Sequence, residues 1–588
     1  AGSREPGAGS REPGAGSREP GAGSREPGAG SREPGAGSRE PGAGNREPGT
    51  GNRTVLFAVR NATALHRLLD AAPALADDSA VVPVFTLVPG SDFDADALAA
   101  LDGRGARCVP WDEARATSYD LILAASANGV GELSGPLVLL PHGAGFGKRV
   151  PYARGADSAN GLSPDQLLRP DGTPVARLHA LPHPDERARL AAEAPAAARP
   201  AAVVGDPTLD RILESVPRRA RYRAALGTGG RRLVAVLSTW GPESLLERRP
   251  ELPARLAATL PYDAFQVALV LHPNERARHG EFALRQRLAR LERAHVVLAG
   301  GYEEWGAVLV AADCVITDHG STALYAAALD RPVVSAYDGG GELLPGTPIA
   351  RLLRGAPYLD DARPYAPQLE RALTAHEPGV VRAHAGGAFA EPGHALERLR
   401  ESLYGLLELP PPEAPAQPAP LPPPRPDTGA RVAAFAVESR VRGNTAEVTR
   451  HPAAGAGEGG WLAAEADWAG SRYVQGARLL YRYAAAGEAP GWCAEALAAY
   501  PVCRTAAVLT PDGGCAVRTR GGPLRWLRFL PPARGSAPDP VAVLCGVHAW
   551  LAEHPEADGP GERPGRAAGV RCRAGGRTAE VVAVSLPR

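Results

Sequence analysis

Methionine is absent from this 588-residue sequence, and lysine is almost absent. Lys148 is the one lysine among 65 lysine and arginine residues, so arginine supplies nearly every positive charge. Alanine, glycine, proline and arginine dominate instead, which indicates the coding bias of a GC-rich genome and predicts a high-GC bacterial source. Such a bias weakens arguments from residue propensity. The rarity of lysine makes Lys148 conspicuous. A compact ammonium differs in shape and hydration from a guanidinium, so arginine does not replace lysine at every kind of site.

The sequence also lacks net charge, paired cysteines and long apolar runs. Its 65 basic and 65 acidic residues cancel, which argues against a nucleic-acid binder. The seven cysteines are scattered, odd in number and without a CxxC pair, so neither a disulfide framework nor a zinc site is predicted. We see no signal peptide and no run of 18 apolar residues. We therefore expect a cytoplasmic protein, with peripheral attachment to the inner membrane face left open.

Low-complexity segments divide the chain. Residues 1–49 repeat AGSREPG and its variant AGNREPG, which carry no large apolar side chain, so we predict a disordered tail over residues 1–53. Residues 408–428 are rich in proline and predict a polyproline-type linker. Between them lies a body of residues 54–407, and residues 429–588 form a separate C-terminal unit.

The body alternates short apolar runs with stretches of helical spacing, which predicts an α/β fold with parallel sheets. The first series includes TVLFAVR, DLILAAS and PLVLL, and the second includes AAVVGD, RLVAVLS and DCVITD. We predict two Rossmann-like domains, residues 54–198 and 199–407, that face each other across a cleft. Ligands of such sheets bind beyond the carboxyl ends of the strands, so we expect a site at those ends.

Polar clusters follow five of the predicted strands: PHGAGFGK, GDPTLD, STW, HPNE and DHGSTALYAAALD. Five such clusters at five strand ends favour a binding cleft over mere packing. The GK pair suggests a nucleotide triphosphatase, but a Walker A loop needs four residues between its first glycine and GK, then Ser or Thr. Here three residues separate Gly143 from Gly147, and Arg149 follows Lys148. A GTP-binding translation-type factor is therefore a disfavoured alternative.

The segment DHGSTALYAAALD predicts a strand that ends at Asp318, a turn at Gly320, and a helix capped by Ser321 or Thr322. The free N–H groups and the dipole of that helix would offer a site for a pyrophosphate. The alternative is an ordinary capped helix of a parallel sheet, in which Asp318 only orients the backbone.

In their order and spacing these clusters resemble the CDP-glycerol glycerophosphotransferases, teichoic-acid polymerases with a two-domain GT-B fold, over about residues 54–400. The resemblance implies an N-terminal acceptor-side domain and a C-terminal nucleotide-donor domain. It also implies transfer of a glycerophosphate or glycosyl group from a nucleotide-activated donor to an acceptor hydroxyl, on an envelope polymer or lipid. No metal or cofactor is implied, because histidine, hydroxyl and helix-end donors would supply the charge stabilisation.

The resemblance assigns roles to single residues. His142 matches the family's catalytic base, which takes the proton from the attacking hydroxyl, a role that suits a neutral imidazole. His272, Ser321 and Thr322 match the groups that hold the donor diphosphate, and Lys148 would add a mobile positive charge. The other residues expected to line the nucleotide site are Thr239, Trp240, Asp318 and Gly320.

Three features depart from the family pattern. Tyr325 stands where an acidic residue is usual, seven positions after the aspartate of the motif, and the spacing from His142 to Lys148 is one residue longer. The basic surface for docking on an anionic polymer is missing. A changed acceptor, or a non-catalytic nucleotide-binding or interaction protein on the same scaffold, would account for these departures. We expect His319 to be an exposed turn histidine, and Trp240 either to stack on a base or to pack the cleft wall.

The C-terminal unit resembles no family known to us. Segments such as RVAAFAVES and AEVVAVSL predict antiparallel strands, and VAVLCGVHAWLAEHP predicts an amphipathic helix over residues 541–555. We predict a small α+β accessory domain of unknown role, in which five cysteines serve as small buried residues.

Overall fold

The structure is a computed structural model that describes residues 52–90, 95–149, 161–299, 303–426, 431–454, 459–530, 532, 536–555 and 569–584. The disordered tail predicted for residues 1–53 lies outside these ranges, except for its last two residues. None of the helices within the ranges combines the length and the apolar composition that a bilayer crossing requires.

The first half of the body is built on a sheet of six parallel strands in the order β2-β1-β3-β4-β5-β6. Separate apolar cores pack on its two faces, as expected for a parallel sheet covered on both sides. The strands are β1 Arg53–Val59, β2 Val81–Leu87, β3 Leu121–Ala124, β4 Leu137–Leu139, β5 Leu178–Leu181 and β6 Ala201–Val203. The helices are α1 Ala62–Ala71, η1 Ala72–Leu75, α2 Ala95–Asp102, α3 Trp111–Ala116, η2 Val130–Glu132, α4 Pro164–Leu167, α5 Pro184–Glu193 and α6 Pro195–Ala198.

The second half contains a sheet of five parallel strands in the order β11-β10-β7-β8-β9. The two parallel sheets predicted from the alternating pattern are therefore present. The strands are β7 Arg232–Ser238, β8 Phe265–Leu271, β9 Val297–Leu298, β10 Cys314–Thr317 and β11 Val333–Ser335. The helices are α7 Pro207–Ser215, η3 Val216–Arg218, α8 Arg219–Ala225, α9 Leu245–Arg248, α10 Leu252–Thr259, α11 Pro273–Arg293, α12 Glu304–Ala311, α13 Thr322–Ala328, η4 Gly340–Glu342, α14 Pro348–Gly355, α15 Tyr365–Thr374, α16 Val380–His384 and α17 Ala395–Leu407.

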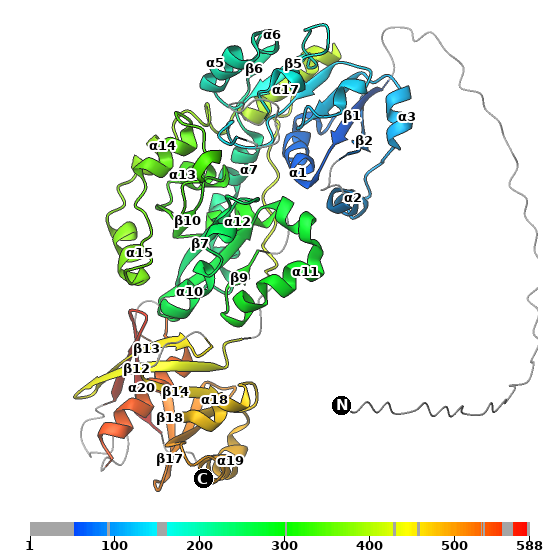
Figure 1. The fold of residues 1–588 in the computed structure, drawn as a ribbon. Helices are drawn as coiled ribbons and strands as arrows, with labels where there is room; N and C mark the ends of the chain where they lie inside the picture. The colour runs from blue at the N-terminus through cyan, green and yellow to red at the C-terminus, as the bar shows by residue number, and fades with distance from the viewer. Residues whose placement is uncertain are drawn as a thin grey trace, which may run out of the picture. The chain divides into compact units, whose positions relative to one another are not determined.

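The chain passes between the two sheets at different points from those predicted. The strand in AAVVGD was assigned to the second domain, but β6 pairs with β5 and completes the first sheet. Helix α17 also returns to the first half, where Leu399 and Leu403 join the core that contains β1 and β3. Figure 1 shows α17 in yellow-green among the cyan elements β5 and β6. Strand β6 and helix α17 thus pack with the first half although they lie beyond residue 198, because burial on the first sheet outweighs proximity in sequence.

The described part of the predicted proline-rich linker packs along the body. Leu421 is buried in the core around β7, and its carbonyl accepts a hydrogen bond of 2.7 Å from the Tyr222 hydroxyl. Ala416 is buried in the core of the first half. Its amide donates to the Glu397 carboxylate at 2.6 Å. The described part of this segment, residues 408–426, therefore connects the two α/β halves.

The C-terminal unit forms a closed barrel in the strand order β12-β13-β19-β20-β18-β17-β16-β15-β14. The prediction of antiparallel strands is only partly correct, since β13·β19, β14·β15 and β15·β16 are parallel pairs. The five cysteines of this unit are buried, as predicted. The strands are β12 Ala434–Arg442, β13 Thr445–Pro452, β14 Trp461–Glu465, β15 Ala477–Tyr483, β16 Thr505–Leu509, β17 Gly514–Thr519, β18 Leu524–Leu530, β19 Val570–Ala574 and β20 Arg577–Ala583. The helices are α18 Ser471–Gly476, η5 Ala486–Glu488, α19 Ala489–Ala499 and α20 Pro540–Glu553.

Helix α20 corresponds to the helix predicted over residues 541–555, but it is not amphipathic. Every residue from Val541 to Leu551 is buried, because the apolar face of the barrel packs around this helix. A helix that is buried all round needs apolar or small residues on every side, which explains its valine, alanine, cysteine and glycine content.

Candidate functional site

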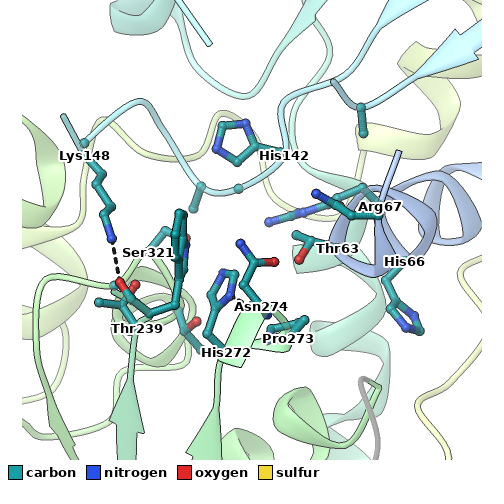
Figure 2. A pocket seen from close by; sticks show the side chains of 18 of the residues that line it. Thr63, His66, Arg67, His142, Lys148, Thr239, His272, Pro273, Asn274 and Ser321 are labelled. Carbon is teal, nitrogen blue, oxygen red and sulfur yellow. Dashed lines mark hydrogen bonds between the residues drawn. The ribbon is translucent and has the colours of Figure 1, made fainter. Parts of the chain in front are cut away.

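A cavity of about 520 Å³ lies at the carboxyl ends of strands from both sheets. Its walls come from the residues that follow β1, β3 and β4 in the first half and β7, β8 and β10 in the second. Figure 2 shows side chains of both halves pointing into it, with His142 on one side and His272 on the other. All nine residues predicted for the site line this cavity: His142, Lys148, Thr239, Trp240, His272, Asp318, Gly320, Ser321 and Thr322.

His142 stands in the loop after β4, at the wall that the first half contributes. Burial, and then the positive charge of Arg67, lower its pKa from 6.5 to about 4. The imidazole is therefore neutral near pH 7 and can accept a proton. Its pKa also makes it a weak base, since proton transfer is most efficient when the pKa lies near the working pH.

The glycine-rich loop after His142 allows the two halves to approach each other. A Cβ atom at Gly143 would lie 3.0 Å from the Ser321 hydroxyl, and one at Gly147 would lie 2.6 Å from the Ile349 side chain. Gly143 and Gly147 are therefore required at the contact between the two halves, because a side chain at either position would collide with the second half. This accounts for a Gly-rich segment that fails the Walker A spacing.

Glu186 of α5 lies beneath the same loop and is fully buried. Its carboxylate accepts a hydrogen bond from the Phe146 amide, and a Cβ at Gly145 would lie 3.1 Å from it. Arg189 pairs with this carboxylate at 2.9 Å and also donates to the Gly346 carbonyl in the second half. Glu186 and Arg189 therefore hold the loop that carries His142.

Lys148 makes several contacts with the second half, and its role as a mobile charge stays a prediction. Its ammonium pairs with Glu342 at 2.9 Å and donates to the Trp240 carbonyl at 2.9 Å. Figure 2 draws the second bond as a dashed line. The same ammonium lies 4.7 Å from the centre of the Trp240 ring, as in a cation–π contact. A lysine suits this position because its compact point charge has three donor directions, whereas a guanidinium is a planar fork.

His272 caps α11, and its tautomer follows from that role. Its Nδ1 accepts a hydrogen bond of 3.1 Å from the Asn274 amide, so the proton of the neutral ring is on Nε2. Burial, and then the charges of Lys148 and His142, lower its pKa to about 3. His272 is therefore a neutral hydrogen-bond donor near pH 7.

Asp318 organises the loops on the donor side. Its carboxylate accepts from the amides of Thr239, Leu245 and Gly320 at 2.8, 2.8 and 2.9 Å. Burial raises the pKa of this carboxyl. Asp318 thus orients the backbone, which is the alternative role considered for it from the sequence. Ser321 precedes α13, and its hydroxyl makes no capping bond to that helix.

His319 is buried, so the prediction of an exposed turn histidine is wrong. Its Nε2 lies 3.1 Å from the Glu342 carboxylate, and its ring packs against Gly339, where a Cβ would lie 2.2 Å from it. Gly339 has a φ of +82°, which only glycine adopts readily. Glu342 therefore joins His319 and Lys148 in one buried polar cluster.

The sequence analysis missed the contribution of α1 to the site. Arg67 of α1 lines the cavity and donates to both Asp206 oxygens at 3.2 Å. It also donates to the Tyr325 hydroxyl, which in turn donates to Asp206 at 2.7 Å. Figure 2 shows Arg67, Thr63 and His66 on this helix. The sequence did contain a signal for this contribution. Polar residues follow the first strand directly, and β1 and β4 end at the same edge of one parallel sheet.

Hydrogen-bond donors predominate among the groups that reach the cavity. Arg60, Arg67 and Lys148 are cationic. The two acidic lining residues are engaged by the protein: Asp70 pairs with Arg211 at 2.8 Å, and Asp318 accepts hydrogen bonds from three backbone amides. In the described part of the chain no group of three or more His, Cys, Asp and Glu side chains is arranged to hold a metal ion. The cavity is thus suited to an anionic ligand.

No family model matches this sequence, and no curated protein matches it. Several solved structures match part of this chain. A variant of the wall teichoic acid polymerase TagF with CDPG is 13% identical, covers 60% of this chain and 89% of its own, and has a TM-score of 0.42. Alr3699/HepE of Anabaena with UDP and glucose is 15% identical (61% and 100% covered, TM-score 0.34). S. aureus MnaA with UDP is 13% identical (62% and 99% covered, TM-score 0.40). At these identities and TM-scores, a function has to be inferred from the geometry of the cavity.

Proposed function

We propose that this chain transfers a glycerophosphate or glycosyl group from a nucleotide-activated donor to an acceptor hydroxyl, with a CDP-glycerol-like donor. The observation that carries the proposal is that His142 and His272 line one cavity between the carboxyl ends of two parallel sheets, where burial lowers the pKa of both imidazoles. A volume of about 520 Å³ lies within the range of about 300–1,000 Å³ of small-molecule sites.

The donor diphosphate would lie on the side of the second half. There the Nε2–H of His272 and the Ser321 hydroxyl donate to its oxygens without bringing further charge. Fixed donors of this kind stabilise charge that develops on a leaving group without reorganising at the moment of reaction. The Arg67 guanidinium adds long-range positive potential from α1.

The acceptor hydroxyl would lie beside His142. Its oxygen attacks the phosphorus that carries glycerol, the bond between the two phosphates breaks, and the nucleoside monophosphate leaves with the electron pair. His142 takes the hydroxyl proton and later releases it to water. Binding of the anionic donor raises the pKa of His142, because it offsets the positive charge of Arg67. The base is therefore strengthened only when the donor is present.

The second candidate is a protein that binds a nucleotide without turning it over. The pKa of about 4 for His142 favours it, since so weak a base contributes little proton transfer unless the ligand changes it. Both candidates use the same binding groups and differ in what happens after binding.

Calorimetric titration with CDP-glycerol, UDP-glucose, CDP and GTP, followed by an assay for nucleotide release with polyol acceptors, tests the proposal. We expect His272→Ala to weaken binding by about 10- to 100-fold, as for a lost hydrogen bond to a charged group. We expect His142→Ala to retain binding but to lower nucleotide release by about 100-fold or more. His376→Ala, outside the cavity, is the control. Binding without release by any acceptor supports the second candidate, and the absence of binding by every nucleotide refutes both.

A further inference from the structure

A second cavity, of about 530 Å³, lies at the opposite end of the first sheet, where β4, β5 and β6 begin. Its walls come from the residues directly ahead of these strands and from the turn held by the Leu168–Pro174 bridge. Three arginines line it, Arg169, Arg177 and Arg199, and none of the described lining residues is acidic. The two cavities share no lining residue.

Prolines and a backbone hydrogen bond restrain the walls of this second cavity. Pro136, Pro174 and Pro200 line it, and the pyrrolidine ring fixes φ at each. The Arg177 amide donates to the Leu137 carbonyl at 2.7 Å, which ties the start of β5 to β4. The arginines are therefore attached to a backbone that would not have to reorganise when a ligand binds.

The positive charge of this cavity is only partly neutralised by the surrounding protein. Within the described ranges neither Arg177 nor Arg199 forms an ion pair, whereas Arg219 and Arg223 both pair with Asp313. Asp171 lies near Arg169 and offsets part of its charge, and the Arg169 guanidinium donates to the Pro174 carbonyl at 3.1 Å, so the charge without an ion-pair partner is that of Arg177 and Arg199. Three like charges around one concave surface focus a positive potential in a chain whose net charge is zero.

We propose that this cavity binds a soluble anion that carries two or more phosphate groups. A guanidinium can donate two parallel hydrogen bonds to the oxygens of a phosphate. No carboxylate among the described lining residues competes for these donors. The three arginines come from three separate segments, the turn after α4 and the residues ahead of β5 and of β6, so they can approach a ligand with several phosphate groups from different sides. The volume of the cavity lies within the range of about 300–1,000 Å³ of small-molecule sites. The site is independent of the proposed transferase function, because it uses different residues at the other end of the strands.

Titration calorimetry with inorganic tripolyphosphate, at two salt concentrations, tests this site. The double variant Arg177→Ala/Arg199→Ala should lose one bound tripolyphosphate per chain, or bind it at least tenfold more weakly. Any binding in the main cavity should stay unchanged. Both side chains are exposed, so the variant should fold, and circular dichroism verifies this. The matched control is Arg187→Ala, an exposed arginine of α5 that lines neither cavity, which should behave as wild type.

Three results would overturn the inference. The first is an identical tripolyphosphate titration of the wild type and the double variant. The second is orthophosphate binding as tightly as tripolyphosphate, which would mean that one phosphate suffices. The third is a variant that loses affinity only for phosphatidylglycerol vesicles, compared with phosphatidylcholine vesicles, which would assign these arginines to a lipid surface. None of these outcomes depends on whether a nucleotide binds in the main cavity, so the two proposals can fail separately.

Discussion

Burial sets the protonation of both histidines in the main cavity, and this has consequences for the pH dependence of activity. The pKa of His142 is lowered from 6.5 to about 4, and that of His272 to about 3. Both rings are therefore neutral in the free protein throughout the physiological range. An unperturbed histidine would change its charge within that range.

We predict that kcat/KM for nucleotide release stays flat from pH 8 down to about pH 5 and falls with an apparent pKa near 4. The reason is that kcat/KM reports the free protein, in which His142 is protonated only at about that pH. A pH-rate profile measures this directly. An acidic limb centred near pH 6.5 would contradict it.

The folded state must be monitored in the same experiment. Because the pKa of His142 is lower in the folded than in the unfolded chain, the stability it contributes is complete above pH 6.5 and is lost as the pH falls toward 4. Circular dichroism at each pH separates loss of activity from loss of structure.

The single lysine is expected to be structural. Lys148→Met would leave the buried Glu342 carboxylate with His319 as its remaining side-chain partner, at a cost of about 1–3 kcal/mol in the free energy of unfolding. Lys148→Arg keeps the charge but not the compact geometry, so we expect an intermediate loss of stability. Thermal unfolding of both variants measures these effects. If Lys148→Met matches wild type in stability but loses nucleotide affinity, the ammonium is a ligand-binding group after all.

At the scale of elements, helices α1, α7 and α13 meet in a buried polar junction beside the cavity. The Tyr325 ring of α13 packs against Trp305 and Phe389, with ring centres 5.2 and 5.0 Å away. Its hydroxyl connects Arg67 of α1 to Asp206, the cap of α7. Tyr325 stands where the CDP-glycerol glycerophosphotransferases that the sequence resembles usually have an acidic residue. Its hydroxyl therefore forms hydrogen bonds with other residues of the protein.

We predict that Tyr325→Phe lowers the free energy of unfolding by about 1–3 kcal/mol, because Asp206 loses a buried donor and Arg67 an acceptor. Nucleotide affinity should fall as well, since Arg67 is then less well held at the cavity wall. The matched control is Tyr404→Phe, which removes a 2.8 Å hydrogen bond to Asp78 away from the cavity. That variant should lose stability alone. Equal nucleotide affinity in the two variants would contradict the predicted role of the junction.

The sequence predicted best those elements whose signal lies within a few neighbouring residues. The strands of the body are continuous apolar runs, and the polar residues directly after them line the cavity as expected. The partners of those residues could not be predicted. Arg67 reaches Asp206 and Tyr325 across 139 and 258 positions of sequence, and Glu342 meets Lys148 and His319 only in the folded chain. Likewise, nothing in the sequence of β6 indicates which of the two sheets it joins.

At the scale of the whole molecule, one buried ion pair connects the barrel to the second α/β half. Arg450 of β13 is fully buried and forms two hydrogen bonds with Asp263, of 2.8 and 2.6 Å, just before β8. Its carbonyl also accepts a hydrogen bond of 2.8 Å from the Tyr262 amide. The composition of the proline-rich segment could not predict this connection, because Arg450, Asp263 and Tyr262 all lie outside that segment. The barrel is thus attached to the body through a specific contact.

We predict that Arg450→Met lowers the free energy of unfolding by about 3–5 kcal/mol, because it leaves the Asp263 carboxylate buried without a countercharge. Calorimetry should then show the barrel unfolding separately from the body. The double variant Arg450→Met/Asp263→Leu should regain most of the loss, since replacing both partners removes the uncompensated charge. Arg573→Met, which breaks a half-exposed pair with Glu447 on the neighbouring strand, should cost less than about 1 kcal/mol. A double variant as unstable as Arg450→Met would mean that packing of the arginine stem, and not its charge, holds the barrel in place.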